Sequence, residues 1–246
     1  MRRTRLFVPL PLERGQELAL PEGPRRHLLQ VLRARPGQAL VLFNGEGGEF
    51  HGELVSASKR EARVHLVDFD PVDRESPLDL ALAQGVARGT HMDLALQKAT
   101  ELGVRRILPL VCRRSVLPPH QVEKKMAHWQ GVIIAACEQS GRTRLPELAP
   151  PRPLDIHAEA LAGAREIQAL LLHPGEQPAS ALLDTLDAKR PIQLLIGPEG
   201  GFDAAERERL CAAGARALGL GPRVLRTETA ALAGITLLQH RLGDLG

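Results

Sequence analysis

The sequence is poor in cysteine. It has three cysteines, Cys112, Cys137 and Cys211, and no two of them form a Cys-x-x-Cys pair. An odd number of cysteines without that spacing excludes a disulfide-rich scaffold and argues against a zinc site. The nine histidines are scattered without the spacing of metal ligands, so we expect no bound metal. This cysteine usage predicts a protein of a reducing cytoplasm.

Long hydrophobic runs are also missing. No apolar stretch approaches the roughly 18 residues that are needed to cross a bilayer. The basic and apolar start of the chain is interrupted by Pro9, Pro11 and Glu13, which makes it too short for a signal peptide. We therefore expect a soluble protein without membrane contact. Its 246 residues, 43% hydrophobic and 25% charged, are enough for one large or two small domains.

Lysine is scarce relative to arginine. The chain has 27 Arg and 5 Lys, the 32 basic residues together, although its net charge is only +3. Arginine is the better residue for binding phosphate and for stacking on bases, so this bias points toward nucleic acid. Genome composition or adaptation to heat also produces such a bias, and composition alone leaves these explanations open.

Residues 1–70 are predicted to form a small β-barrel that carries one helix. The runs Ala39–Phe43 and Arg63–Phe69 are rich in β-forming residues, and Asn44-Gly45 is a strong turn signal. A helical stretch is expected between Pro24 and Arg33. Its spacing places four residues on one face, namely His27, Leu28, Val31 and Leu32.

Four arginines crowd this N-terminal region: Arg25, Arg26, Arg33 and Arg35. A basic cluster on a small barrel is a plausible surface for contacting RNA phosphates. The alternative is a solvated helix face without a partner. Residues 71–77 follow, with prolines and charges but no apolar periodicity, and they are predicted to be a linker.

Residues 78–246 are predicted to form an α/β domain. Strand candidates are residues 80–84, 106–111, 166–172 and 192–196. Four helices are predicted. Three of them span residues 92–102, where Gly103 ends the helix, residues 121–138 and residues 227–241. The fourth begins at a cap formed by Asp203 and Glu206. This alternation predicts a mostly parallel sheet covered on both faces.

Two glycine-containing turns follow strands of this sheet, at Ile196–Phe202 and at Leu220–Ala230. Turns at the carboxyl edge of a parallel sheet are where ligands bind, and glycines allow close approach of the backbone. The first turn has no lysine for a phosphate and carries Glu199 instead, which would suit a cationic or hydroxyl-rich ligand such as a sulfonium nucleoside. The alternative is an ordinary strand-to-helix turn.

The two turns occur together with three further motifs, in the order Gln97–Val104, Arg114–Val116, Ala136–Arg142, Ile196–Phe202 and Leu220–Ala230. In combination these motifs closely resemble the RsmE family, bacterial methyltransferases that act on N3 of a uridine in 16S ribosomal RNA. The resemblance covers nearly the whole chain. Departures are minor: Gly89–Asp93 is less basic than usual, and Cys112-Arg113 stands where an acidic residue is common.

The resemblance implies a SPOUT-type α/β sheet with a C-terminal trefoil knot, preceded by a PUA-like RNA-binding barrel. It also implies a homodimer, 16S rRNA of the small ribosomal subunit as partner, and S-adenosylmethionine as methyl donor, held by three loops. The cofactor residues that it implies are Leu172, His173, Pro174, Ile196, Gly197, Glu199, Gly200, Gly201, Leu220, Gly221, Leu225, Thr227, Thr229 and Ala230.

The chemistry suggests roles for individual residues. Uracil N3 must lose a proton, so a cation that stabilises the charge on O2 or O4 would help, and Arg226 beside the cofactor turn is the first choice. Glu199 could orient the cofactor or serve as base, and Arg142 is the further catalytic candidate. RNA contacts are expected from Lys98, Arg113, Arg114, Gln139 and Arg142. Structural ion pairs are the alternatives, Arg226 with Glu228 and Lys98 with Glu101.

Two other functions remain open. The chain could be an RNA-binding or ribosome-assembly factor that has lost catalysis, although such a protein would not need Glu199 or Arg226. It could also be a SPOUT enzyme of another specificity, such as a ribose 2′-O-methyltransferase. The pairing of the two glycine-containing turns argues against that specificity.

Overall fold

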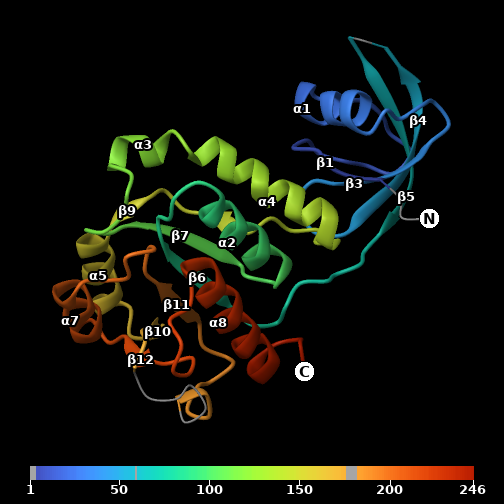
Figure 1. Ribbon diagram of the computed structural model, residues 1–246. Coiled ribbons are helices and arrows are strands. Elements are labelled where there is room, and N and C mark those ends of the chain that lie inside the picture. The colour runs from blue at the N-terminus through green and yellow to red at the C-terminus, as the bar shows by residue number, and fades with distance from the viewer. Residues whose placement is uncertain (1–3, 59, 176–181) are drawn as a thin grey trace. The chain divides into compact units, whose positions relative to one another are not determined.

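The computed structural model describes residues 4–58, 60–175 and 182–246 (Figure 1). The chain divides into two compact units. The first comprises Met1–Glu75 and Cys137–Leu145, and the second comprises Ser76–Ala136 and Pro146–Gly246. The sequence predicts a linker at 71–77 and places 137–145 in the second domain. In the structure, residues up to Glu75 and the segment Cys137–Leu145 belong to the first unit.

The first unit contains a five-stranded sheet with the strand order β1-β3-β4-β5-β2. Strands β1 (Thr4–Phe7) and β3 (Ala39–Phe43) are parallel, whereas the other neighbours are antiparallel. The remaining strands are β2 (Glu17–Ala19), β4 (Glu49–Ala57) and β5 (Ala62–Asp70). Both predicted strands are therefore confirmed.

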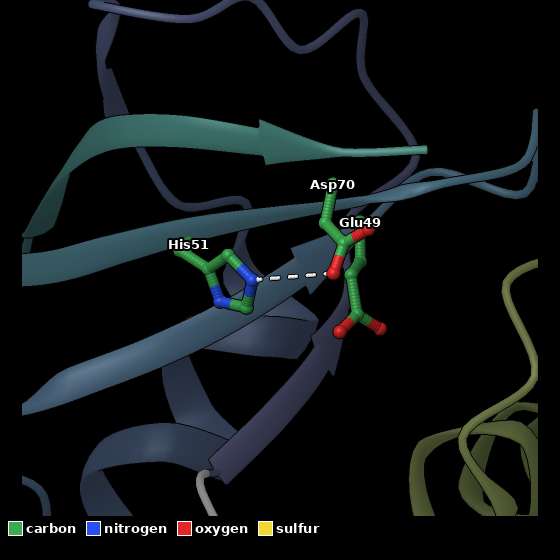
Figure 2. Close-up of side chains that lie close together, drawn as sticks. All are labelled: Glu49, His51 and Asp70. Atoms are coloured by element: carbon green, nitrogen blue, oxygen red, sulfur yellow. Dashed lines mark ion pairs between the residues drawn. The ribbon is translucent and has the colours of Figure 1, made fainter. Parts of the chain in front are cut away.

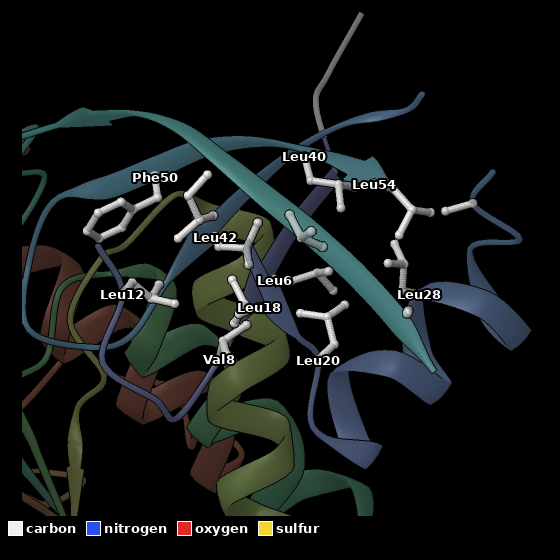
Figure 3. Packing of buried hydrophobic residues seen from close by; sticks show 14 residues of the cluster. Leu6, Val8, Leu12, Leu18, Leu20, Leu28, Leu40, Leu42, Phe50 and Leu54 are labelled. Atoms are coloured by element: carbon white, nitrogen blue, oxygen red, sulfur yellow. The ribbon is translucent and has the colours of Figure 1, made fainter. Parts of the chain in front are cut away.

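One hydrophobic core holds the first unit together (Figure 3). Alternate residues of the strands point into it, as Leu40 and Leu42 of β3 do, because successive side chains of a strand face opposite sides. Leu28 of the helical segment completes this core and is fully buried. Burial of its isobutyl group contributes roughly 2 kcal/mol to stability.

The predicted N-terminal helix differs from expectation. It is a short α-helix, α1 (Glu22–Arg26), followed by a π-helical turn, η1 (His27–Val31). Val31 and Leu32 are 66% and 41% exposed, so the predicted face with Leu28, Val31 and Leu32 does not form. A π-turn has more residues per turn than an α-helix, which rotates later residues away from the face of Leu28.

The second unit contains a seven-stranded sheet with the order β12-β10-β11-β6-β7-β8, and β9 also pairs with β7. Every pairing is parallel. The strands are β6 (Leu80–Gly85), β7 (Arg106–Val111), β8 (Glu147–Leu148), β9 (Arg152–Pro153), β10 (Gln168–Leu172), β11 (Ile192–Ile196) and β12 (Arg216–Leu218). The predicted parallel α/β sheet is confirmed.

Helices cover both faces of this sheet (Figure 1). On one face α2 (Thr90–Glu101) packs against α8 (Thr227–Leu242), and Gly234 of α8 lies against the side chains of Leu172 and Leu194. On the other face α5 (Leu154–Gly163) and α7 (Ala204–Ala212) bury a second core that includes Leu195. Leu194 and Leu195 thus face opposite sides, which makes β11 apolar throughout.

The predicted helix over residues 121–138 is interrupted. The structure has α3 (Pro119–Glu123) and α4 (Met126–Ser140), separated by a tight turn in which Lys125 N donates to the Val122 carbonyl at 2.9 Å. The cap predicted at Asp203 is confirmed as a reciprocal capping box with Glu206. Among the described residues, no helix combines the length and the apolar character that spanning a bilayer requires.

Candidate functional site

A pocket of about 250 Å3 lies at the carboxyl ends of three neighbouring strands of the second unit, β10, β11 and β12. Its walls are the loops that follow these strands and the first turn of α8. It is lined by Arg114, Leu172, His173, Pro174, Ile196, Gly197, Pro198, Glu199, Gly200, Gly201, Phe202, Leu220, Gly221, Arg223, Val224, Leu225, Thr227 and Ala230. Of the predicted cofactor residues, only Thr229 is absent from this lining.

The loop after β11 is folded tightly, and this requires glycine. A Cβ added to Gly197 would lie 2.8 Å from the backbone nitrogen of Phe202. Gly201 has φ +67°, and its N–H donates to the Pro198 carbonyl at 2.8 Å. The backbone therefore turns back on itself within a few residues and presents main-chain groups to the pocket.

A buried chain of hydrogen bonds from β6 and α8 stabilises this loop. The hydroxyl of Thr227 donates to the Gly197 carbonyl at 2.6 Å. The amide of Gln84, which is fully buried at the end of β6, donates to that hydroxyl at 2.8 Å and to the Gly85 carbonyl at 3.0 Å. Sequence reasoning missed Gln84, since a single glutamine in an apolar strand gives no local signal of its partner.

Glu199 lies on the exposed side of the same loop. One of its carboxylate oxygens accepts the N–H of Arg88 at 2.6 Å, just before α2 begins. A carboxylate at the N-terminal end of a helix is favourably placed relative to the helix dipole. This bond ties the glycine loop to the start of α2 and gives Glu199 at least a structural role.

Arg226 is the N-cap residue of α8 and lies between two pocket residues, Leu225 and Thr227. Its side chain is exposed and forms no hydrogen bond or ion pair with any residue that the structure describes. Glu228, the predicted alternative partner, is buried and lies 3.0 Å from Nδ1 of His91 instead. The Arg226 guanidinium is thus free to meet a ligand.

Two further arginines lie near the pocket, in the loop after β7. Arg114 lines the pocket and donates to the Gly200 carbonyl at 2.6 Å. Arg113 is exposed, and its guanidinium lies 3.4 Å from Asp203. Arg223 and Val224 are pocket-lining residues that were not singled out from the sequence, although they lie inside a motif that was.

The other predicted RNA contact of the second unit, Lys98, is paired with Glu101. Its ammonium donates to both carboxylate oxygens, at 2.8 and 2.9 Å. This is the ion pair that the sequence offered as the alternative, and partly exposed pairs of this kind contribute only about 0.5 kcal/mol.

Arg142 has an environment unlike the one expected of a catalytic or RNA-binding residue. It belongs to the first unit and is only 4% exposed. Its Nε donates to both carboxylate oxygens of Glu75, at 3.0 and 3.2 Å. Arg5 donates to its backbone carbonyl at 3.1 Å. Its guanidinium is occupied by a buried, bidentate ion pair, which is a structural arrangement. Gln139, by contrast, is exposed.

The basic cluster of the first unit is only partly free. Arg25 donates to the Arg60 carbonyl, and Arg26 donates to Gln30 at 3.1 Å. Arg33 and Arg35 are exposed, and Arg33 has φ +50°, a conformation that few non-glycine residues adopt. The cluster therefore offers at least two exposed guanidinium groups near the end of the π-helical turn.

One group of potential metal ligands lies elsewhere in the first unit, formed by Glu49, His51 and Asp70 (Figure 2). Their ligand atoms lie within 4.8 Å of one another. However, the Glu49 carboxylate is already bound by Arg5 and Arg74. Burial alone would raise the pKa of Glu49, but hydrogen bonds from both guanidinium groups lower it below its usual value. Two adjacent positive charges disfavour a divalent cation here.

Comparison with known proteins identifies the group to which this architecture belongs. Residues 74–239 match the model of an RNA methyltransferase domain, and residues 25–67 match that of an RNA methyltransferase PUA domain. The ribosomal RNA small subunit methyltransferase E of Buchnera aphidicola is 30% identical over 98% of this chain and 97% of its own length. That of Bacillus subtilis is 30% identical over 96% of both chains. The chain belongs to the ribosomal RNA small subunit methyltransferase E family.

Solved structures agree with this membership. A putative methyltransferase from Legionella pneumophila, solved with the bound cofactor SAM, is 38% identical and superposes with a TM-score of 0.92 over 100% of both chains. Methyltransferase E from Neisseria gonorrhoeae, bound to S-adenosylmethionine, is 36% identical with a TM-score of 0.90, also over 100% of both. The family models thus confirm two predictions made from the sequence, an RNA methyltransferase domain and a PUA domain.

Proposed function

We propose that the protein transfers a methyl group from S-adenosylmethionine to N3 of a uridine in 16S rRNA of the small ribosomal subunit, in the cytoplasm. The observation that carries the proposal is the convergence of three loops, from Leu172, Ile196 and Leu220 onward, on one pocket. Two motifs that lie close together in sequence predicted the loops from Ile196 and Leu220, the family resemblance implied the loop from Leu172, and all three contribute to its walls.

The residues of the pocket fit such a ligand. Leu172, Ile196, Leu220 and Leu225 supply apolar surface for an adenine ring, while the glycine loop supplies backbone donors and acceptors. Glu199 brings a negative charge that suits a cationic sulfonium, while Arg114 and Arg223, which also line the pocket, suit an anionic partner such as an RNA phosphate. When bound, the cofactor supplies an electrophilic methyl group.

Arg226 is the proposed catalytic residue. Uracil N3 becomes nucleophilic when it loses its proton, and the charge then spreads to O2 and O4. An exposed guanidinium directly beside two pocket residues can donate hydrogen bonds to such an oxygen. Glu199 is assigned a positioning role, because it holds Arg88, and Arg142 is assigned a structural role through Glu75.

RNA binding is proposed for Arg113, Arg114 and Arg223 near the pocket, and for Arg33 and Arg35 of the first unit. These arginines are exposed, and guanidinium groups suit phosphate contacts. The match of residues 25–67 to a PUA domain supports the assignment for the first unit. On the basis of the family resemblance, we also propose that the first unit forms a closed PUA-like barrel, that the second unit contains a trefoil knot and that the protein is a homodimer.

The test is methylation of small ribosomal subunits from a strain that lacks this modification, with and without the purified protein. Mass spectrometry of the digested 16S rRNA should find one new methyl group on a uracil base. A methyl group on a ribose would indicate 2′-O specificity instead. Binding of the subunit without any methyl transfer would favour an assembly factor.

A further inference from the structure

Glu206 has a second bonding partner that a helix cap does not require. It is only 4% exposed, and both of its carboxylate oxygens accept main-chain N–H groups. Oε2 accepts the N–H of Asp203 at 2.9 Å, which completes the capping box of α7. Oε1 accepts the N–H of Arg113 at 2.7 Å, from the loop after β7. One buried carboxylate thus joins two loops that are far apart in sequence.

The loop that Glu206 holds is a closed turn. Ser115 N donates to the Cys112 carbonyl at 3.0 Å, and Cys112 N donates to the Ser115 hydroxyl at 3.1 Å. Because the turn is closed by its own bonds, fixing the Arg113 N–H also fixes the backbone of Arg114. Cys112 of this turn also packs in the core that contains Leu210 of α7, and the guanidinium of Arg113 contacts the N-cap residue Asp203 in an exposed ion pair, which contributes little.

Arg114 reaches the pocket from this turn. Its aliphatic part packs on Gly200, where an added Cβ would lie 3.1 Å from both its Cβ and its Cδ. Its Nη1 donates to the Gly200 carbonyl at 2.6 Å. A guanidinium has five N–H donors, so after this one bond most of its donors can still contact a phosphate.

We infer that Glu206 is a positioning residue for RNA: its carboxylate holds the Cys112–Ser115 turn so that Arg114 lies across Gly200 at the pocket, ready to contact the RNA substrate. The inference rests on the proposed function, since Arg114 has an RNA contact only if the pocket holds the methyl donor. It assigns Glu206 no contact with RNA or cofactor.

The experiment is a double-mutant cycle of Glu206→Gln and Arg114→Ala, measured on the full-length protein. Glutamine has one acceptor oxygen where glutamate has two, so it can accept only one of the two main-chain N–H groups, and the link between the α7 cap and the turn is broken in either orientation. RNA affinity should fall about tenfold in each single variant, while the Kd for S-adenosylmethionine of Glu206→Gln, whose side chain does not line the pocket, stays within about twofold. The double variant should bind RNA no worse than Arg114→Ala alone, because coupled residues are not additive.

Two controls separate positioning from simple loss of stability. Glu208→Gln makes the same chemical change at an exposed position of α7 and should leave RNA affinity unchanged. Asp203→Ala removes the acceptor that caps α7 but leaves the Glu206 bond to Arg113 in place, so it should lower the Tm without lowering RNA affinity as much. If Glu206→Gln does not fold, Glu206→Asp, too short to reach both N–H groups, takes its place.

Three results would overturn the inference: multiplicative losses in the double variant, equal loss of cofactor affinity in Glu206→Gln, or equal loss of RNA affinity in Asp203→Ala. Failure of the proposed function would look different. In that case the unmodified protein would fail to methylate 16S rRNA, whatever the cycle of RNA affinities shows.

Discussion

Arg226 is exposed at the start of α8, between two residues of the pocket. If it stabilises the uracil oxyanion, Arg226→Ala should reduce the single-turnover methylation rate about a hundredfold, the usual cost of losing one such donor. Folding and cofactor binding should change little, since no described residue depends on the side chain. Arg226→Lys keeps the charge and should recover part of the rate. A variant that loses cofactor affinity with the chemical step intact would make Arg226 a binding residue.

Glu138 gives a pH-dependent prediction. Burial raises the pKa of its carboxyl, although the hydrogen bond from Phe7 N at 3.0 Å and the charges of His27 and Arg5 oppose the rise. A carboxyl whose pKa is higher in the folded state stabilises the fold at low pH, and this contribution is lost as the pH rises through the folded-state pKa. Glu138→Gln keeps an acceptor for Phe7 and does not titrate. The Tm of Glu138→Gln minus the Tm of the original protein should therefore be larger at pH 7 than at pH 4.

Melting curves from pH 4 to pH 8 test this prediction. Glu159→Gln, which removes the same charge at an exposed position, serves as a control for altered net charge. A Tm difference for Glu138→Gln that does not vary with pH would show that the carboxyl does not titrate differently in the folded and unfolded states.

At the level of elements, the glycine loop between β11 and α7 leaves no room for a side chain at Gly197. Gly197→Ala would place a methyl group 2.8 Å from a backbone nitrogen and 2.9 Å from a backbone carbon, so the loop must open. Cofactor affinity should fall about tenfold or more, as measured by calorimetry. Gly200→Ala is the milder comparison in the same loop, because the atoms nearest to its methyl group lie at 3.1 Å and belong to the side chain of Arg114 instead of the backbone. Equal losses in both variants would mean that the tight turn is not what binds the cofactor.

The sequence predicted elements whose signal is local. Three strands have the predicted bounds because each is an apolar run of strand length, namely Ala39–Phe43, Arg106–Val111 and Ile192–Ile196. Strand β4 (Glu49–Ala57) was missed, since it contains Glu49, His51, Gly52 and Glu53, and its pairing with β5 stabilises it. Helix α5 was missed because it follows a proline-rich segment.

The same distinction applies to the site. The two glycine-containing pocket loops were predictable because each is a short contiguous motif after a strand, whereas the loop from Leu172 was implied only by the family resemblance. Gln84 and the second role of Glu206 were not, since each depends on a partner that is distant in sequence. Arg142 was predicted to be catalytic and to contact RNA because nothing local indicates its buried pair with Glu75.

On the scale of the whole molecule, the segment Cys137–Leu145 makes the first unit discontinuous in sequence. Three of its residues, Cys137, Arg142 and Thr143, are buried, and the Arg142 partner Glu75 lies at the end of the N-terminal part of that unit. All residues that line the pocket belong instead to the second unit. A fragment of residues 76–246 should therefore still bind S-adenosylmethionine, but with a lower Tm than the full chain.

A substitution of Arg142 tests whether the fragment is less stable because the ion pair with Glu75 is lost or because truncation destabilises the protein in general. In the full chain, Arg142→Ala leaves the buried Glu75 carboxylate unpaired and should cost about 3 kcal/mol of stability. In the fragment, which lacks Glu75, the same substitution should change the Tm little, since the ion pair is already gone. Calorimetric unfolding of the four proteins measures both effects. An equal cost of Arg142→Ala in the two backgrounds would show that the residue stabilises the second unit, and that the segment Cys137–Leu145 does not depend on the N-terminal part of the chain.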